Sequence, residues 1–255
     1  MPDSYVGPFR VLSENYERIY AVGDIHGNLK ELKTLLDFVF TQDPLTENDL
    51  VVFLGDYVDR GPASCEVVNY VRDFRASNPN TLCLQGNHEE MLLSFLGVSG
   101  DHGDFYLENG GVQCFDSYGI TASTDRSKIR REFPDEHIEF FSSLEVGIIV
   151  GHFILVHAGI RPTVPLEEQD SHDLRWIRRE FIHNQHRFGK TVVFGHTAFN
   201  GLFVDLPYKL GIDTGIAYGN ALSIVELTHG DHYQIELGDD QPTKGKIPNF
   251  LPSGS

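Results

Sequence analysis

Six short clusters rich in glycine, histidine and aspartate each follow a short apolar run in this 255-residue chain. They are GDIHG, GDYVDRG, GNHE, HAG, GHT and DTG, at residues 23–27, 55–61, 86–89, 157–159, 195–197 and 213–215. In α/β folds, ligands bind beyond the carboxyl ends of the strands, so six loops at six strand ends can converge on one site. The first five clusters supply Asp, His and Asn, which are ligands of hard or borderline metal ions. The pattern therefore predicts a metal site at one end of a sheet.

The first two clusters bring carboxylates to this site. Asp24 and His26 are two residues apart, so in an extended segment both side chains point the same way and can reach one ion. Asp56 in the second cluster is placed so that its carboxylate can bridge two cations. Arg60 of the same cluster has a planar guanidinium that matches phosphate oxygens. A surface turn with a local Asp–Arg pair would explain this cluster alone, but not its recurrence after a second apolar strand.

The next three clusters add an amide and three histidines. Asn87 offers a neutral, hard oxygen ligand, and His88 beside it is a candidate ligand or proton donor. His157 and His196 each stand next to a glycine or alanine that lets the backbone approach the site. His152 is interpreted as part of a hairpin turn. The other histidines do not sit where a strand meets a glycine cluster and are assigned no role: His102, His137, His172, His183, His186, His229 and His232.

A parallel sheet is expected to position the first three clusters, because strand and helix patterns alternate in this part of the chain. The expected elements are a strand ending at Val22, a helix carrying Leu29, Leu32, Leu36 and Val39, a strand over Leu50–Leu54, a helix after Pro62, a strand over Thr81–Leu84 and a helix over Glu89–Phe95. This βαβαβ order implies parallel strands with right-handed crossovers.

The rest of the chain is less regular, but nothing in it suggests a second domain. The expectations are a helical insertion beside the site over Asp101–Leu144, a helix over Pro134–Leu144 within it, a hairpin turn at Gly151 and His152, one helix over Asp173–Ile182 and a loosely held tail over Asp239–Ser255. No internal repeat and no linker divides the chain. A single domain over residues 1–255 is therefore expected.

Composition excludes several classes of partner. The formal net charge of −17 argues against non-specific binding to nucleic acid or to an anionic membrane. It does not exclude an anionic substrate, because bound metal can reverse the sign locally. The three cysteines show no CxxC spacing and are expected to be reduced and structural. No signal-peptide-like stretch and no run of ~20 apolar residues is present, so a cytoplasmic location is expected.

The ordered set GDIHG, GDYVDRG, GNHE, HAG and GHT resembles the phosphoprotein phosphatase family of metal-dependent serine/threonine phosphatases, in its bacterial and phage type. The GD, H and GNH elements are similar to those of the wider calcineurin-like metallophosphoesterase superfamily. The DRG ending at 59–61 narrows the resemblance to the phosphoprotein phosphatases and the related symmetrical diadenosine tetraphosphatases. The resemblance covers about Arg18 to Leu227. It implies an α/β fold with two mixed sheets packed as a sandwich and flanked by helices.

The same resemblance implies two divalent metal ions, Mn²⁺ or alternatively Fe or Zn. It places Asp24 and His26 on the first ion and Asp56 between the two. The second ion is assigned to Asn87, His157 and His196. It implies hydrolysis by attack of a hydroxide that bridges the metals, with His88 as the general acid, Asp59 orienting His88, and Arg60 and Asn87 contacting the phosphate.

A second phosphate-binding arginine lies between the HAG and GHT clusters in the family. Bacterial members carry it in a W-x-R segment, which here is Trp176-Ile177-Arg178. Arg178 is therefore the first choice for this role, and Arg161, Arg175 and Arg179 are the alternatives. The other interpretation of Arg178 is that it lies on a solvated helix face.

The sixth cluster, Asp213 to Gly215, resembles a stretch of bacterial members near their C-terminal strands. It is followed by Tyr218. Two interpretations remain open for this segment, a structural one and a contact with substrate.

The implied substrates are phosphoserine and phosphothreonine in proteins or peptides, with phosphotyrosine as a further substrate of small bacterial members. The alternative is a nucleotide polyphosphate hydrolase of the symmetrical diadenosine tetraphosphatase type. A catalytically dead binding protein is a third hypothesis, which the intact ligand set disfavours.

Overall fold

The computed structural model describes residues 4–13, 16–123 and 125–250. Its first sheet has six strands in the order β13-β12-β11-β3-β4-β5. Their bounds are β3 (Arg18–Val22), β4 (Asp49–Phe53), β5 (Thr81–Cys83), β11 (Ala221–Glu226), β12 (Asp231–Glu236) and β13 (Thr243–Lys246). Strands β3, β4 and β5 are parallel, and Val22 pairs with Phe53, which pairs with Cys83. The three strands therefore end level with one another, as the sequence predicts.

The second sheet has seven strands in the order β1-β2-β6-β7-β8-β10-β9. Their bounds are β1 (Ser4–Val6), β2 (Phe9–Val11), β6 (Gly147–Val150), β7 (Phe153–Val156), β8 (Thr191–Phe194), β9 (Phe203–Asp205) and β10 (Lys209–Gly211). Strand β8 is parallel to both β7 and β10. The antiparallel pair β6 and β7 forms the predicted hairpin around Gly151 and His152. The loops that follow β7, β8 and β10 thus leave this sheet at one end.

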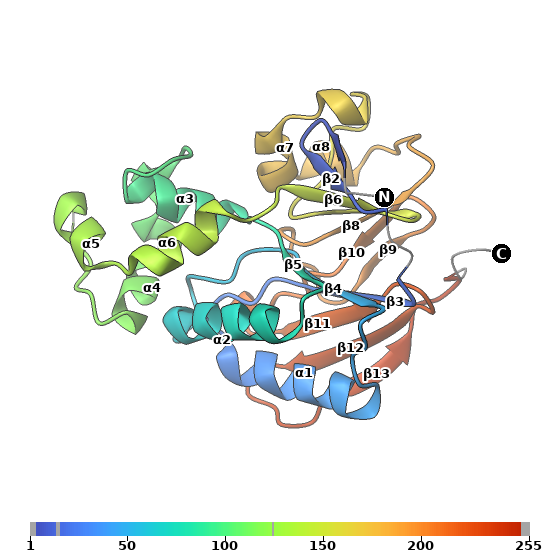
Figure 1. Ribbon diagram of the computed structural model, residues 1–255, viewed down its shortest axis with the longest axis horizontal. Helices are drawn as coiled ribbons and strands as arrows, with labels where there is room; N and C mark the ends of the chain where they lie inside the picture. The colour runs from blue at the N-terminus through green and yellow to red at the C-terminus, as the bar shows by residue number, and fades with distance from the viewer. Residues whose placement is uncertain (1–3, 14–15, 124, 251–255) are drawn as a thin grey trace.

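Alternation along the strands explains how the two sheets pack face to face (Figure 1). Ala21 and Val52 belong to a buried cluster between the sheets that also contains Leu155 and Val193 of the second sheet. Their neighbours Tyr20, Val22, Val51 and Phe53 point to the opposite face, because successive strand residues alternate in direction. Helices α1 (Leu29–Gln42) and α2 (Ser64–Ser77) cover that face. The outer face of the second sheet packs against Leu174 and Phe181. The expected sandwich of two mixed sheets flanked by helices is confirmed.

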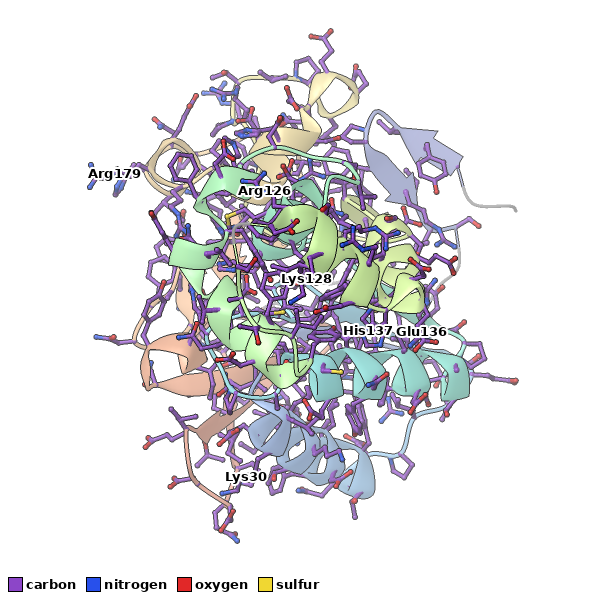
Figure 2. The ribbon with its side chains drawn as sticks, turned by 90° about the vertical axis from the view of Figure 1, so that its left-hand side faces the viewer. Lys30, Arg126, Lys128, Glu136, His137 and Arg179 are labelled. Atoms are coloured by element: carbon purple, nitrogen blue, oxygen red, sulfur yellow. The ribbon has the colours of Figure 1, made fainter. Side chains whose placement is uncertain are left out.

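Between β5 and β6 the chain forms α3 (Asn87–Phe95) and then the helical insertion expected over Asp101–Leu144. The insertion contains short 3₁₀ turns at Gly103–Phe105 and Leu107–Asn109, α4 (Gly111–Ser117), α5 (Arg126–Glu132) and α6 (Asp135–Ser142). Figure 1 shows it at the left of the molecule, and Figure 2 views that side, with Arg126, Lys128, Glu136 and His137 on it. Helix α3 begins two residues earlier than predicted, so Asn87 and His88 occupy its first turn.

Two segments differ from the sequence-based expectation. The single helix expected over Asp173–Ile182 is broken into α7 (Ser171–Trp176) and α8 (Arg179–Ile182). The backbone leaves helical geometry at Ile177 (ψ 140°) and Arg178 (φ −130°, ψ −95°). Part of the expected loose tail, residues 243–246, pairs with β12 as the edge strand β13. The end of that tail, 251–255, lies outside the described residues.

Two further expectations concern cysteines and membranes. Cys65, Cys83 and Cys114 are free thiols, as expected for structural cysteines. Among the described residues, no helix has the length and apolar character required to cross a membrane.

Candidate metal centre

Six loops converge where strands of both sheets end. The segments after β3, β4 and β5 bring the first three clusters from the six-stranded sheet, and those after β7, β8 and β10 bring the rest. Two groups of three side chains within this site have ligand atoms within 4.8 Å of one another. They are His26, Asp56 and His88, and Asp56, His157 and His196, all buried. Because Asp56 belongs to both groups, the arrangement is consistent with a pair of metal ions that share one carboxylate.

Each oxygen of Asp56 faces a different histidine. Its Oδ2 lies 3.4 Å from His26 Nε2, and its Oδ1 lies 3.3 Å from His157 Nε2. Burial opposes ionisation of Asp56, but His157 and His88 hold its pKa well below the ordinary value. Burial also lowers the pKa of His26 to about 3, so this imidazole is neutral at pH 7 and has a lone pair for a ligand.

Asn87 joins the two histidines of the second group. Its Oδ1 lies 3.0 Å from His157 Nε2 and 2.7 Å from His196 Nδ1. Burial lowers the pKa of His196 well below its ordinary value. An amide oxygen and two imidazole nitrogens therefore point at one small volume, as three ligands of a borderline metal would.

Asp24 supports the fit to a cation most directly. Its Oδ2 accepts a hydrogen bond from the His196 backbone N–H at 2.9 Å, whereas its Oδ1 is buried without a hydrogen-bond partner among the described residues. Burial raises its pKa well above the ordinary value, and the nearby carboxylates of Asp213 and Asp56 raise it further. Buried carboxylates that repel one another fit a site that holds metal, because a cation would satisfy the lone oxygen and offset the repulsion.

The backbone around these ligands is strained in a pattern that matches the site. Among the described residues, seven non-glycine positions have positive φ. Five of them are predicted site residues: His26, Asp56, Asp59, Arg60 and His196. Such conformations cost of order 1–3 kcal/mol each and persist where surrounding structure imposes them. Gly86 and Gly195 are also constrained, since a Cβ would collide with the carboxylates of Asp56 and Asp24 respectively.

His88 and Asp59 form a buried pair beside the two groups. His88 Nδ1 lies 2.6 Å from Asp59 Oδ2, while His88 Nε2 lies 3.9 Å from Asp56 Oδ2. With Asp59 ionised, the carboxylate only accepts, so Nδ1 carries the proton, and Nε2 is the nitrogen that faces the centre. Burial lowers the pKa of His88 to about 4 and raises that of Asp59 well above its ordinary value.

Two arginines approach the centre from opposite sides. Arg60 Nη1 lies 3.4 Å from His26 Nε2 and donates to the Tyr218 hydroxyl at 2.9 Å, with its guanidinium over the Tyr218 ring. Arg178 Nη1 donates to the His196 carbonyl at 2.9 Å. The break between α7 and α8 falls at Arg178, which separates it from a regular helix face.

The alternatives to Arg178 are engaged or directed elsewhere. Arg161 is paired with Asp173 and with Glu180. Arg175 is paired with the buried Glu90 at 3.0 Å. Figure 2 shows Arg179 at the periphery, pointing outward.

Glu89 and Tyr106 are site residues to which the sequence analysis assigned no role. Glu89 is fully buried and accepts hydrogen bonds from the backbone N–H groups of Gly86, Asp56 and Tyr57, at 2.9, 3.0 and 2.8 Å. Its place as the last residue of GNHE was the available signal. Tyr106 donates its hydroxyl to Asp59 Oδ1 at 2.6 Å from within the helical insertion. No local pattern around Tyr106 marks it.

The sixth cluster also lies at the centre. Asp213 is buried, and its Oδ1 accepts from the Gly215 N–H at 2.9 Å. Thr214 Oγ1 bonds to Ser223 Oγ at 2.6 Å, which ties the loop to β11. Tyr218, in a 3₁₀ turn over Ile216–Tyr218, is 68% exposed although it contacts Arg60. The Thr214 contacts are structural, whereas Tyr218 stands at the mouth of the site.

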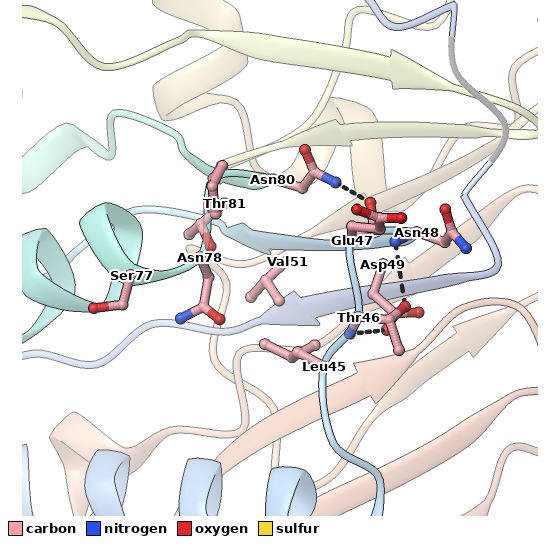
Figure 3. Close-up of a pocket in the computed structure, with 11 residues that line it drawn as sticks. Leu45, Thr46, Glu47, Asn48, Asp49, Val51, Ser77, Asn78, Asn80 and Thr81 are labelled. Atoms are coloured by element: carbon pink, nitrogen blue, oxygen red, sulfur yellow. Dashed lines mark hydrogen bonds between the residues drawn. The ribbon is translucent and has the colours of Figure 1, made fainter.

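A cavity of about 520 Å³ lies elsewhere in the fold, at the amino ends of β4 and β5 (Figure 3). Its lining includes Asn48, Asp49, Asn78 and Asn80, and the Asn80 side chain donates to the Glu47 carbonyl at 2.6 Å. It has no histidine and no arginine in its lining. Because it opens at the opposite ends of the strands from the metal-ligand groups, it is separate from the candidate centre.

Comparison with known proteins places the whole site within one matched region. Residues 17–232 match the family described as calcineurin-like phosphoesterase. The chain is 28% identical to the symmetrical bis(5'-nucleosyl)-tetraphosphatase of Nitrosospira multiformis, over 59% of this chain but only 46% of that protein. It is 27% identical to serine/threonine-protein phosphatase 1 of Salmonella typhimurium, over 86% of this chain and 95% of that protein. A crystal structure provisionally assigned as a diadenosine tetraphosphatase superimposes with a TM-score of 0.66, at 22% identity, covering 89% of this chain and 96% of the other.

Proposed function

The chain belongs to the calcineurin-like phosphoesterase family, and on that premise we propose that it is a metal-dependent protein phosphatase that hydrolyses phosphoserine and phosphothreonine monoesters. Phosphotyrosine is a further substrate of the same proposal. The alternative is hydrolysis of a dinucleoside polyphosphate by the same centre. The observation that carries phosphoester hydrolysis is the placement of Asp56 between two buried histidine groups, with His88 held beside them by Asp59.

We assign the metal ligands by position. Asp24 and His26 would hold one divalent ion, Asn87, His157 and His196 the other, and Asp56 both. Two such ions, Mn²⁺ in our proposal, would supply a water nucleophile at neutral pH and neutralise charge on the phosphate. The histidine nitrogens that lie within 3.4 Å of each Asp56 oxygen support two ion positions that share this carboxylate.

The phosphate is proposed to bind between Arg60 and Arg178, with the Asn87 side chain beneath it. Both guanidiniums lie next to a histidine of the centre, His26 for Arg60 and His196 for Arg178. In the described part of the chain, the side-chain hydrogen bonds of Arg60 and Arg178 go to His26, Tyr218 and His196 and not to a carboxylate, so both can receive an anion. Planar guanidinium groups contact two phosphate oxygens at once, and they hold the group for in-line attack.

His88 is proposed as the general acid. The acid form of His88 is the imidazolium, in which Nε2 carries a proton in addition to the one that Nδ1 shares with Asp59. When the P–O bond to the leaving group breaks, the leaving oxygen takes the electron pair and the Nε2 proton, giving the free alcohol and neutral His88. Water contributes the oxygen of the new P–O bond, and its released proton restores His88. Asp59 holds Nδ1, so the acid nitrogen faces the centre rather than the protein interior. Positioned proton transfer of this kind contributes ~10²–10⁴-fold to the rate.

The charges around the centre support a substrate with one phosphate over a polyphosphate chain. Arg60 contributes to the lining of two cavities of about 590 and 520 Å³. The first contains Lys30, which is paired with Asp240 at 2.7 Å, and the second contains Glu108 and no lysine. A chain of four phosphates would thus meet few free cations beyond the arginines.

The extent of the sequence matches also supports a phosphoprotein substrate over a dinucleoside polyphosphate. The chain and the Salmonella phosphatase match over 86% and 95% of their lengths. The match to the Nitrosospira tetraphosphatase covers 46% of that protein. The structural likeness to a provisionally assigned tetraphosphatase, at 22% identity, speaks for the fold and does not separate the two substrates.

The test is a direct comparison of kcat/KM for a phosphothreonine peptide and for diadenosine tetraphosphate, with Mn²⁺ present. We expect a clear preference for the phosphopeptide. A preference for the dinucleotide would replace the leading proposal with the alternative. Absence of hydrolysis of either substrate and of p-nitrophenyl phosphate, in protein shown to contain metal, would contradict both.

A further inference from the structure

Tyr106 makes a contact that the proposed acid step does not yet account for. Its hydroxyl lies 2.6 Å from Asp59 Oδ1, while the other carboxylate oxygen, Oδ2, lies 2.6 Å from His88 Nδ1. The Asp59 backbone N–H is also engaged, by Ser64 Oγ at 2.9 Å. Tyr106 and Asp59 are both fully buried. The three side chains therefore form one continuous line, Tyr106–Asp59–His88, that ends at the candidate centre.

Tyr106 donates its hydroxyl to Asp59 Oδ1. With Asp59 ionised, the carboxylate only accepts, so His88 Nδ1–H donates to it as well. Burial raises the pKa of Tyr106 well above its ordinary value, so the hydroxyl keeps its proton at all pH values near neutrality. Without the hydroxyl, Asp59 would keep the Cys114 thiol, a weak donor, as its other side-chain partner besides His88, and the carboxylate could rotate away from His88.

The ring of Tyr106 is held so that the hydroxyl has one direction. It packs against Phe95 and Phe115, with ring centroids 5.5 Å away in each case. Gly111 lies directly against the ring, where a Cβ would collide with the ring carbons. This packing explains why a tyrosine from the helical insertion reaches a residue 47 positions earlier in the chain.

The same segment of the insertion also contacts the proposed phosphate clamp. The Gly110 carbonyl accepts a hydrogen bond from the Arg60 backbone N–H at 3.3 Å. A Cβ at Gly110 would collide with the backbone of Arg60. The insertion is thus joined to the centre at two adjacent points, one on Asp59 and one on Arg60.

We infer that Tyr106 is a positioning residue for the acid step: its hydroxyl fixes the Asp59 carboxylate, which in turn fixes the His88 imidazole with Nε2 toward the leaving group. This inference rests on the proposed function, because it requires His88 to be the acid. It adds a role for the helical insertion, which supplies the outermost member of the line. Tyr106 touches neither substrate nor metal, so its effect must appear through His88.

The test uses Tyr106→Phe in the full chain loaded with Mn²⁺. Phenylalanine keeps the ring packing and removes only the donor. Turnover of a phosphothreonine peptide, whose alkoxide leaves poorly, is expected to fall about 5- to 20-fold, which is part of the ~10²–10⁴-fold that a positioned acid contributes. The loss on p-nitrophenyl phosphate should be several-fold smaller, because its leaving group needs less protonation. An equal loss on both substrates, or none on the peptide, would overturn the inference.

Tyr118→Phe is the matched control. Tyr118 also lies in the insertion, and its hydroxyl bonds to His137 Nδ1 at 2.8 Å rather than to Asp59. Tyr118→Phe should remove a partly buried hydroxyl without changing the ratio of peptide to p-nitrophenyl phosphate rates. If Tyr118→Phe shifts the ratio as Tyr106→Phe does, the effect is a general one of the insertion and the inference fails.

A double variant separates failure of the inference from failure of the proposed function. In a His88→Asn background, Tyr106→Phe should cost less than about 2-fold, because the residue through which it acts is gone. If His88→Asn lowers the rates on the peptide and on p-nitrophenyl phosphate equally, the acid role of His88 is wrong and the proposed function needs revision. If His88→Asn lowers the peptide rate more than the p-nitrophenyl phosphate rate but Tyr106→Phe does not, only the inference about Tyr106 is wrong.

A readout independent of activity covers the case in which Tyr106→Phe does not fold. In the wild-type protein, a buried hydroxyl that donates over 2.6 Å should give a proton NMR signal that exchanges slowly with solvent. A nuclear Overhauser effect between that proton and the His88 Nδ1 proton is expected, because both protons lie against the same carboxylate. Lack of a protected hydroxyl signal would overturn the inference without any variant.

Discussion

Asp56 Oδ1 lies 3.3 Å from His157 Nε2, and this contact joins the two sheets of the molecule at the candidate centre. Asp56 follows β4 of the six-stranded sheet, whereas His157 follows β7 of the seven-stranded sheet. The ligands that we propose for one ion therefore come from both halves of the sandwich. Metal binding is thereby coupled to the packing of the sheets against each other.

Asp56→Asn should remove metal from both positions. An amide has no charge and cannot bridge two cations as a carboxylate does, so bound Mn²⁺ measured by elemental analysis should fall from two equivalents toward zero. Turnover should drop on the order of 10²–10³-fold or more, because metal supplies several kcal/mol of charge stabilisation. Asp37→Asn, at an exposed position on α1, is the control and should keep both ions. Full metal content in Asp56→Asn would exclude the shared-ligand assignment.

His88→Asn should reduce turnover while leaving the metal in place. The proposed acid is lost, so we expect a decrease of ~10²–10⁴-fold on a phosphothreonine peptide. His88 also belongs to a possible ligand group with His26 and Asp56, so metal content distinguishes a role as acid from a role as ligand. Loss of one metal equivalent from His88→Asn would identify His88 as a ligand and contradict the acid role.

Arg178→Ala should weaken phosphate binding. A hydrogen bond to a charged group contributes about 1.5–3 kcal/mol, so KM for p-nitrophenyl phosphate, or the inhibition constant of inorganic phosphate, should rise roughly 10- to 100-fold. Arg179→Ala is the matched control, since this neighbouring arginine points away from the molecule in Figure 2. Similar kinetics for the two variants would show that Arg178 is not the second phosphate-binding arginine.

Asp49→Asn should destabilise the fold in a way that depends on pH. Asp49 accepts hydrogen bonds from Arg18 Nε at 2.8 Å and from the Thr46 N–H at 2.7 Å, and its side chain is buried. Burial opposes its ionisation, but Arg18 and Thr46 hold its pKa below the ordinary value. A carboxyl with a lowered folded-state pKa stabilises above its unfolded pKa of about 3.9, and this stabilisation is lost as the pH falls further.

Urea unfolding of metal-free protein measures this effect. The free energy of unfolding of Asp49→Asn should lie about 1–3 kcal/mol below that of the wild type at pH 7, and the gap should close as the pH falls below about 4. Asp43→Asn removes the exposed partner of the same arginine, at 2.8 Å, and should cost no more than about 1 kcal/mol. A gap that stays constant from pH 7 to pH 3 would show that the loss is not electrostatic.

Much of the fold was predictable because local signals agreed with one another. The parallel β3, β4 and β5 follow from three apolar runs separated by helical spacing, and each expected strand was found to within about a residue of its bounds. The break at Arg178 was not predictable, because residues 173–182 have no proline or glycine to end a helix. Edge strand β13 was also missed, since residues 243–246 are mostly exposed and pair through the backbone rather than through an apolar pattern.

The sequence by itself determined the residue types that could form the centre, because Asp24, Asp56, Asn87, His157 and His196 each follow a strand and carry ligand atoms. Only the tertiary structure decided which of them meet and what holds them. It placed Asn87 Oδ1 between His157 and His196, engaged Arg161 and Arg175 with acids, and brought Tyr106 onto Asp59. The reason is physical: ligand chemistry is a property of single side chains at strand ends. Contact between residues 47 or 109 positions apart depends instead on how sheets and insertion pack.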